Sequence, residues 1–81
     1  MFPNTLDNAK VLYYTDGKVA DYIKYLAICK YQNRKEEYYL FRCDENFEVV
    51  GDSVWNSIEE CMGVANASYN GNIIWIEVKW L

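Results

Sequence analysis

The sequence predicts an α+β fold: an antiparallel β-meander of four to five strands, one α-helix at about residues 57–70 packed on one face, and a C-terminal strand. Runs of β-branched and aromatic residues alternate with short polar turns through the first two thirds of the chain. A helix-capping motif follows, and a last β-rich run, IIWIEVKW (73–80), closes the chain. The 81 residues suit one domain, which we place at 10–81, after an N-terminal head, 1–9, whose composition is compatible with disorder.

The first predicted strand is KVLYYT (10–15), which is rich in strand-forming residues and runs into Asp16-Gly17. This dipeptide readily takes the positive φ angles of a type I′ turn, so we expect a hairpin that returns through KVADY (18–22). The segment 18–30 also carries apolar residues at helical spacing, and periodicity alone leaves strand and helix open there.

A second hairpin is predicted between YLAICKYQ (25–32) and YYLFRC (38–43), because the polar stretch NRKE separates them. A two-residue loop at Arg34-Lys35 sets the register of this pair. The predicted opposed residues are Ile28 with Phe41 and Leu26 with Cys43.

The stretch RCDENFE (42–48) gathers a thiol, an amide and three carboxylates, as a metal loop or a catalytic cluster does. A calcium loop starting at Asp44 needs glycine at its sixth position and glutamate at its twelfth, where this chain has Val49 and Trp55. Two catalytic carboxylates need a cleft that desolvates one of them, which an exposed turn does not provide. We therefore predict a three-residue hairpin turn, DEN, with Asn46 in the left-handed region. The predicted opposed residues are Cys43 with Phe47, Phe41 with Val49, and Arg42 with Glu48.

These registers sort the strand residues onto two faces of the sheet. The face expected under the helix carries Leu26, Ile28, Tyr39, Phe41, Cys43, Phe47 and Val49. The second face is expected to carry Tyr25, Ala27, Cys29, Tyr31, Tyr38, Leu40 and Val50. Either the N-terminal hairpin or the C-terminal tail covers this tyrosine-rich face, or it is a protein interface. The candidate interface residues are Tyr25, Tyr31, Tyr38 and Leu40.

A capping box, SIEE (57–60), predicts the start of the helix. The serine hydroxyl is expected to accept from the Glu60 amide, and the Glu60 side chain to accept from the serine amide. Gly63 indicates either close backbone packing or a weak helix, and Asn-Gly (70–71) ends it. The expected apolar face consists of Ile58, Cys61, Met62, Ala65 and Tyr69.

Composition narrows the functional classes. Twelve acidic residues against eight basic ones give a net charge of −4, which suits a cationic partner and lacks the basic footprint of a nucleic-acid-binding protein. The cysteines, Cys29, Cys43 and Cys61, have no metal-binding spacing, and the chain contains no histidine. We therefore predict no catalytic, cofactor-binding or metal-binding residue and no cofactor. An odd number of cysteines without CxxC spacing and an N-terminus without signal-peptide features predict a cytoplasmic protein. No apolar run approaches the ~20 residues that span a bilayer, so we expect no membrane partner.

The stretches YLAICKY and YYLFRCDENFEVVGDSVWNSIEECM resemble a group of small bacterial proteins of uncharacterised function. In that group a strand hairpin with a CD-turn leads into an SLEEA-type helix and a closing strand, and the similarity covers about residues 22–76. The resemblance implies a compact α+β fold and carries no catalytic residue. Some similar small acidic proteins are immunity proteins that neutralise toxins.

The expected function is that of a small, non-catalytic protein-interaction module. Its partner is either a second copy, bound through the tyrosine face or a sheet edge, or a basic protein that it inhibits in the manner of an immunity protein. The alternative is a small enzyme or ligand-binding domain with a pocket between helix and sheet.

Overall fold

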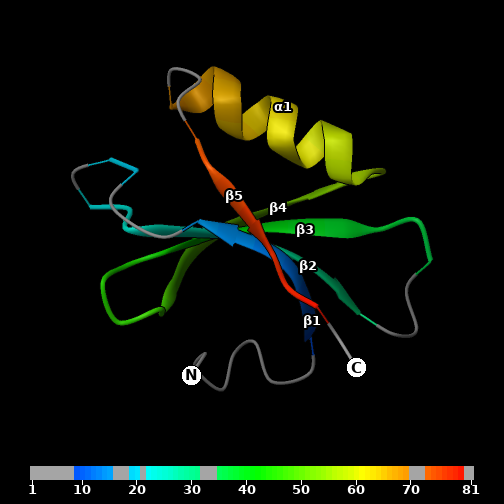
Figure 1. Ribbon diagram of the computed structural model, residues 1–81, viewed down its shortest axis with the longest axis horizontal. Coiled ribbons are helices and arrows are strands. Elements are labelled where there is room, and N and C mark those ends of the chain that lie inside the picture. Colours follow the sequence, from blue (N-terminus) through cyan, green and yellow to red (C-terminus); the bar gives the residue numbers. More distant parts are fainter. Residues whose placement is uncertain (1–8, 16–18, 21, 32–34, 70–72, 80–81) are drawn as a thin grey trace.

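The computed structural model describes residues 9–15, 19–20, 22–31, 35–69 and 73–79, and the radius of gyration is 11.7 Å. In chain order the elements are β1 (Ala9–Thr15), β2 (Tyr25–Tyr31), β3 (Tyr38–Cys43), β4 (Val49–Trp55), α1 (Ile58–Ser68) and β5 (Trp75–Glu77). The strands form one antiparallel sheet in the order β4-β3-β2-β1-β5, and α1 packs on β3 and β4 (Figure 1). The predicted α+β class is therefore confirmed.

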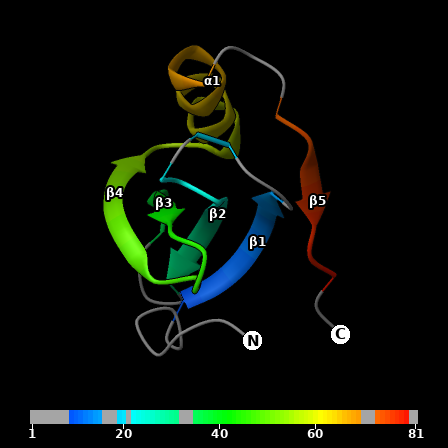
Figure 2. The same cartoon turned by 90° about the vertical axis from the view of Figure 1, so that its left-hand side faces the viewer.

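The chain crosses from one edge of the sheet to the other after β4. Figure 2 shows α1 above a curved sheet, with β5 beside β1 at the far edge. The strand β5 is shorter than the predicted run 73–80, although the amide of Val78 still donates to the Leu12 carbonyl at 2.9 Å. Ala9 already belongs to β1, and the rest of the predicted head, 1–8, lies outside the described residues.

The return strand of the first hairpin was predicted wrongly, because β1 pairs with β2 and not with 18–22. The predicted turn Asp16-Gly17 lies outside the described residues. Where the structure describes 18–22 it has bends, and the amide of Val19 donates to the Ile23 carbonyl at 3.0 Å. The described residues of this segment belong to no strand. In 18–30, where the sequence left strand and helix open, the strand β2 begins at Tyr25.

The strand β1 pairs with the seven-residue β2 and is partly buried. Val11 and Thr15 are buried, and Thr15 Oγ1 accepts a hydrogen bond from the Leu26 amide at 2.8 Å. The register shifts between Val11 and Tyr13, which is the position of a bulge. The buried hydroxyl thus has its partner, as a buried polar group requires.

The register of β2 with β3 differs by one residue from the prediction. Ala27, not Ile28, lies opposite Phe41, and Ile28 lies opposite Leu40. The loop is not the predicted two-residue loop, since Glu36 has φ of 63° and the turn extends to it. Arg34 lies outside the described residues. Because side chains alternate along a strand, a slip of one residue moves every side chain of β3 to the other face.

The turn between β3 and β4 is confirmed as a turn, but its geometry differs from the prediction. The carboxylate of Asp44 accepts from the amides of Asn46 at 2.8 Å and Glu48 at 3.0 Å. Phe47, not Asn46, has the positive φ, 62°. Its ring stacks on Tyr25 with centroids 4.0 Å apart, a contact that offsets the cost of that backbone conformation.

This longer turn also changes the register of β3 with β4. The predicted pairs of Cys43 with Phe47, Phe41 with Val49 and Arg42 with Glu48 are all wrong. Cys43 lies opposite Val49, the register then shifts, and Arg42 lies opposite Gly51. The arginine therefore faces a glycine in place of the expected carboxylate.

The sheet buries residues on both faces. The buried residues on the helix side are Ile23, Leu26, Ile28, Leu40, Cys61 and Ala65. Those on the opposite face are Val11, Ala27, Cys29, Phe41 and Cys43. The placement of Leu26 and Ile28 under the helix is confirmed. Tyr39, Phe41, Cys43 and Val49, which were also predicted there, belong to the other face.

The helix begins as its sequence predicts. Ser57 is the N-cap, and its Oγ accepts from the Glu60 amide at 3.1 Å. The Glu60 carboxylate accepts from the Asn56 amide at 2.9 Å, one residue before the predicted donor. A Cβ on Gly63 would meet nothing within 4 Å, which favours a weak helix over close packing. The predicted apolar face is confirmed, with Cys61 and Ala65 buried and Ile58, Met62 and Tyr69 packed around them.

Candidate functional site

The four predicted interface residues lie on two different faces of the sheet. Tyr25 and Tyr31 pack against the buried cluster of the face away from α1. Tyr38 and Leu40 belong to the helix side, and Leu40 is 2 % exposed. They do not form one surface, because the register of β3 differs from the one that grouped them. Their part in binding a partner stays a prediction.

The tyrosines of the face away from α1 pack on one another. The rings of Tyr31 and Tyr39 meet edge to face at 5.0 Å, and Tyr39 stacks over Phe41 at 5.9 Å. The Tyr39 hydroxyl donates to Glu37 Oε1 at 3.1 Å. The rings of Tyr31 and Tyr39 are half-buried, and they pack against the cluster that contains the small buried residues Ala27 and Cys29. This face therefore has a hydrophobic core of its own, and the partly exposed tyrosine rings form its surface.

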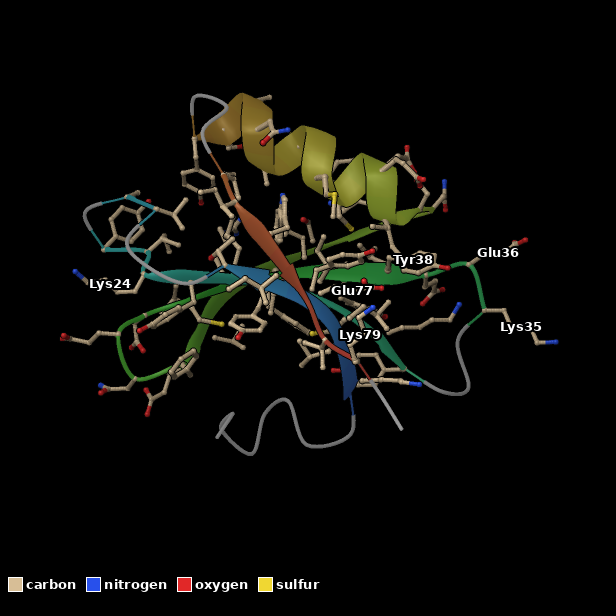
Figure 3. All side chains as sticks on the ribbon, in the orientation of Figure 1. Lys24, Lys35, Glu36, Tyr38, Glu77 and Lys79 are labelled. Carbon is tan, nitrogen blue, oxygen red and sulfur yellow. The ribbon has the colours of Figure 1, made fainter. Side chains whose placement is uncertain are left out.

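Tyr38 is held by contacts on the helix side. The Lys30 ammonium lies 4.6 Å from the centre of its ring and 3.4 Å from its hydroxyl, and the Cys61 thiol donates to its carbonyl at 3.7 Å. Figure 3 shows Tyr38 at the end of β3 that is near the start of α1. Its cation–π contact with lysine contributes about 0.5–1 kcal/mol at a partly exposed site.

Exposed apolar side chains gather on β4, which is an edge strand. Val50 is 54 % exposed and Val54 is 51 % exposed, with the exposed Asp52 between them. Directly opposed residues share a face, so Asp52 lies on the face of Phe41 and Val54 on that of Tyr39. In an edge strand every second residue directs its amide and carbonyl away from the sheet, where they can pair with another strand.

The other edge of the sheet is less suited to such pairing. The strand β5 has three residues, against seven in β4. Glu77 is the last residue of β5, and it forms an ion pair with Lys79, with 3.5 Å between Oε1 and Nζ (Figure 3). Short length and charged side chains protect an edge against strand addition. Within the described residues no further strand pairs with the outer edge of β4, which is therefore the better candidate for an interaction site.

The thiols are poor candidates for chemistry. Burial raises the pKa of Cys29 to about 12 and the pKa values of Cys43 and Cys61 to about 11. At neutral pH they stay protonated, and a protonated thiol is a weak nucleophile. Among the residues that the structure describes, no three His, Cys, Asp or Glu side chains lie together as a metal site.

Sequence reasoning missed two positions, Val54 and Arg42. The alternation of VVGDSVW, with exposed residues at every second position, could have extended the predicted strand beyond Gly51 to Trp55. The environment of Arg42 depends on the register shift between β3 and β4, for which the sequence has no clear signal.

Comparison of this chain with protein-family models, with curated proteins and with solved structures finds no match. The resemblance to small bacterial proteins stays a prediction. In the described part of the chain, α1 is the helix, and with 11 residues it is too short to cross a membrane.

Proposed function

We propose that this protein is a small, non-catalytic protein-interaction module of the cytoplasm, and that it binds a second copy of itself through the free edge of β4. The observation that carries the proposal is the seven-residue edge strand with two half-exposed valines. Backbone groups of an edge strand supply affinity in strand addition, and the alternate side chains supply specificity.

The charge of Asp52 disfavours one arrangement of the two copies. A two-fold axis perpendicular to the sheet places one residue of β4 opposite itself in an antiparallel pair. An axis at Asp52 would oppose two carboxylates, which is unfavourable. An axis at Val54 opposes the two valines and places Asp52 opposite the exposed Asn56 of the other copy. We place the axis at Val54, where the strand residues that pair are Ser53, Val54 and Trp55 of each copy.

Chain length supports self-association. A chain of 81 residues buries about 60–65 % of the surface that its unfolded form exposes, so its core is small. Small domains commonly add stability through oligomerisation. Pairing of β4 also removes the exposed edge, which otherwise is a site for aggregation.

Light scattering over a range of protein concentrations tests the dimer. The wild type is expected to move from monomer to dimer as concentration rises, and Val54→Lys to remain a monomer. Ile74→Lys is the matched control, because Ile74 is 80 % exposed and lies next to β5 at the protected edge. A wild type that is monomeric from micromolar to millimolar concentration overturns the proposal, as does equal loss of the dimer in both variants.

Cysteine cross-linking tests the position of the axis. Directly opposed residues are close enough for a disulfide, so Val54→Cys is expected to form a covalent dimer on oxidation. With the axis at Val54, the two Asp52 positions are four residues apart along the strand, or roughly 13 Å, which a disulfide cannot span. The control Asp52→Cys is therefore expected to stay uncross-linked. The reverse result contradicts this register.

A basic partner is the second candidate, and the net charge of −4 favours it. In this case the module acts as an inhibitor, and binding weakens as salt rises because the attraction is electrostatic. Capture of mainly acidic proteins, or binding that salt leaves unchanged, contradicts this alternative.

A further inference from the structure

The basic residues within the strands all lie on the helix side of the sheet. The Lys30 ammonium lies 4.6 Å from the centre of the Tyr38 ring on that side, and Lys10 is directly opposed to Lys30. Arg42 is opposed to Leu26, which belongs to the helix-side cluster (Figure 2). Directly opposed residues share a face. Among the strand residues that the structure describes, the face away from α1 therefore carries no lysine or arginine.

That face carries carboxylates beside its aromatic rings. Asp52 is exposed and lies opposite Phe41 on this face. Just before β3, the Glu37 carboxylate accepts a hydrogen bond from the Tyr39 hydroxyl at 3.1 Å. Phe41 follows Glu37 by four residues, so the backbone positions of Glu37 and Asp52 are roughly 13 Å apart along the strand direction. The rings of Tyr39 and Phe41 lie between these two positions.

The rings of Tyr31 and Tyr39 form the aromatic part of this surface. They are half-buried and meet edge to face with centroids 5.0 Å apart. On its other neighbour, Phe41, the Tyr39 ring stacks at 5.9 Å with 14° between the planes. Val54, which is opposed to Tyr39 and 51 % exposed, extends the apolar surface toward the edge of β4. Contacts on several sides hold the Tyr39 ring in place before a partner arrives.

We propose that this surface binds an arginine-bearing segment of a basic partner protein. A guanidinium stacks on aromatic rings and pairs with carboxylates, and the surface offers the rings of Tyr31 and Tyr39 with the carboxylates of Glu37 and Asp52. The net charge of −4 attracts such a segment, and no strand cation on this face repels it. A separation of roughly 13 Å matches two arginines four residues apart in an extended segment.

This inference rests on the basic-partner form of the proposed function and not on self-association. Pairing at the edge of β4 uses the backbone groups of that strand, whereas the arginine site uses side chains on a face of the sheet. The two proposals can therefore fail separately.

An NMR titration with a capped pentapeptide tests the site. The peptide has arginine at both ends and a Gly-Ser-Gly centre. Saturable shifts are expected at the rings of Tyr31 and Tyr39, whereas the ring of Tyr38 on the helix side should not shift. Shifts that rise linearly with peptide, or no shifts, overturn both the site and the basic-partner alternative. Saturable shifts centred on Tyr38 or on the turn at Glu45 overturn the site alone.

Charge variants separate this face from general attraction to an acidic protein. Asp52→Asn is expected to weaken peptide binding roughly 2- to 5-fold, the range for an exposed ion pair. Glu45→Gln is the matched control, because it removes the same charge from the exposed turn between β3 and β4 and should leave the affinity unchanged. Equal weakening by both variants overturns the site.

A second peptide, with lysine at both ends, tests the part of the rings at equal charge. The wild type is expected to bind it roughly 2- to 5-fold more weakly, because the lysine ammonium does not stack on a ring as a guanidinium does. Tyr39→Leu should remove this preference, and Tyr39→Phe should retain it because the ring remains. If Tyr39→Leu does not fold, Tyr31→Leu takes its place. Equal affinity of the wild type for both peptides overturns the assignment to arginine.

Discussion

The face of the sheet under α1 and the face that carries the tyrosine rings are built from alternating residues of the same strands. On the helix side, α1 covers Leu26, Ile28 and Leu40. On the other face, the small residues Ala27 and Cys29 lie beneath aromatic rings that pack on one another. The two faces reach similar burial by different means, one through a second layer and one through large side chains on the sheet itself. Each residue of β3 thus depends on the register for its surroundings.

The largest expected effect is that of Phe41→Ala. Phe41 is buried on the tyrosine face, where its ring packs under Tyr39. Loss of the ring leaves a cavity and should lower the free energy of unfolding by about 3–5 kcal/mol. Urea denaturation measures this value. An unchanged midpoint would mean that the tyrosine face does not contribute a core of its own.

Double-mutant cycles test which residues share a face. Ile28→Val and Leu40→Ala affect opposed residues under α1, so their effects should couple by about 0.5–3 kcal/mol. Ile28→Val and Phe41→Leu affect opposite faces and should add to within about 0.5 kcal/mol. Coupling of Ile28 with Phe41 instead of Leu40 would support the register that the sequence predicted.

Alkaline pH should destabilise the protein through thiols on both faces. In the unfolded chain their pKa is near 9.0, whereas burial raises the pKa of Cys29 to about 12 and that of Cys61 to about 11. The folded state therefore keeps protons that the unfolded state loses. The stabilisation is complete below pH 9 and is lost as pH rises from 9 toward 11 and 12, by about 1.4 kcal/mol per pH unit for each thiol.

Alanine variants assign this pH dependence to a face. Cys29→Ala removes the thiol of the tyrosine face and Cys61→Ala that of the helix side. Each variant should lose up to about 1.4 kcal/mol per pH unit of the slope of unfolding free energy against pH, the amount for one proton. The loss should extend over a wider pH range in Cys29→Ala, because the pKa of Cys29 is the higher of the two. Tyrosine and lysine titrations are common to all three proteins. Equal slopes in all three would mean that neither thiol is protected from ionisation.

Local patterns predicted the elements well, because each depends on neighbouring residues. The helix start at Ser57 and the strand YLAICKY follow from capping and from β-propensity. Register depends on turn geometry, and here both turns place a residue with a side chain at positive φ, Glu36 and Phe47. The ring of Tyr25 stabilises Phe47 there, and this contact between distant residues has no local sequence signal. The surroundings of Arg42 and the faces of Tyr38 and Leu40 were mispredicted for that reason.

The smallest expected effect is that of Ser57→Ala, which loosens only the helix side. The variant leaves the Glu60 amide without its acceptor and should lower the free energy of unfolding by about 1 kcal/mol. The exposed helix residue Asn66 offers a control, since Asn66→Ala removes no cap and improves helix propensity. Hydrogen exchange locates the effect.

In that measurement, amides of the first turn of α1 should exchange faster in Ser57→Ala, while amides of β2 and β3 keep their protection. The reason is that the cap satisfies only the helix terminus, whereas the sheet is also held by the tyrosine face. Faster exchange throughout the sheet would mean that the two faces unfold together with the helix and that the tyrosine face has no stability apart from α1. Protection of the sheet alone would show that the aromatic rings stabilise it without the helix layer.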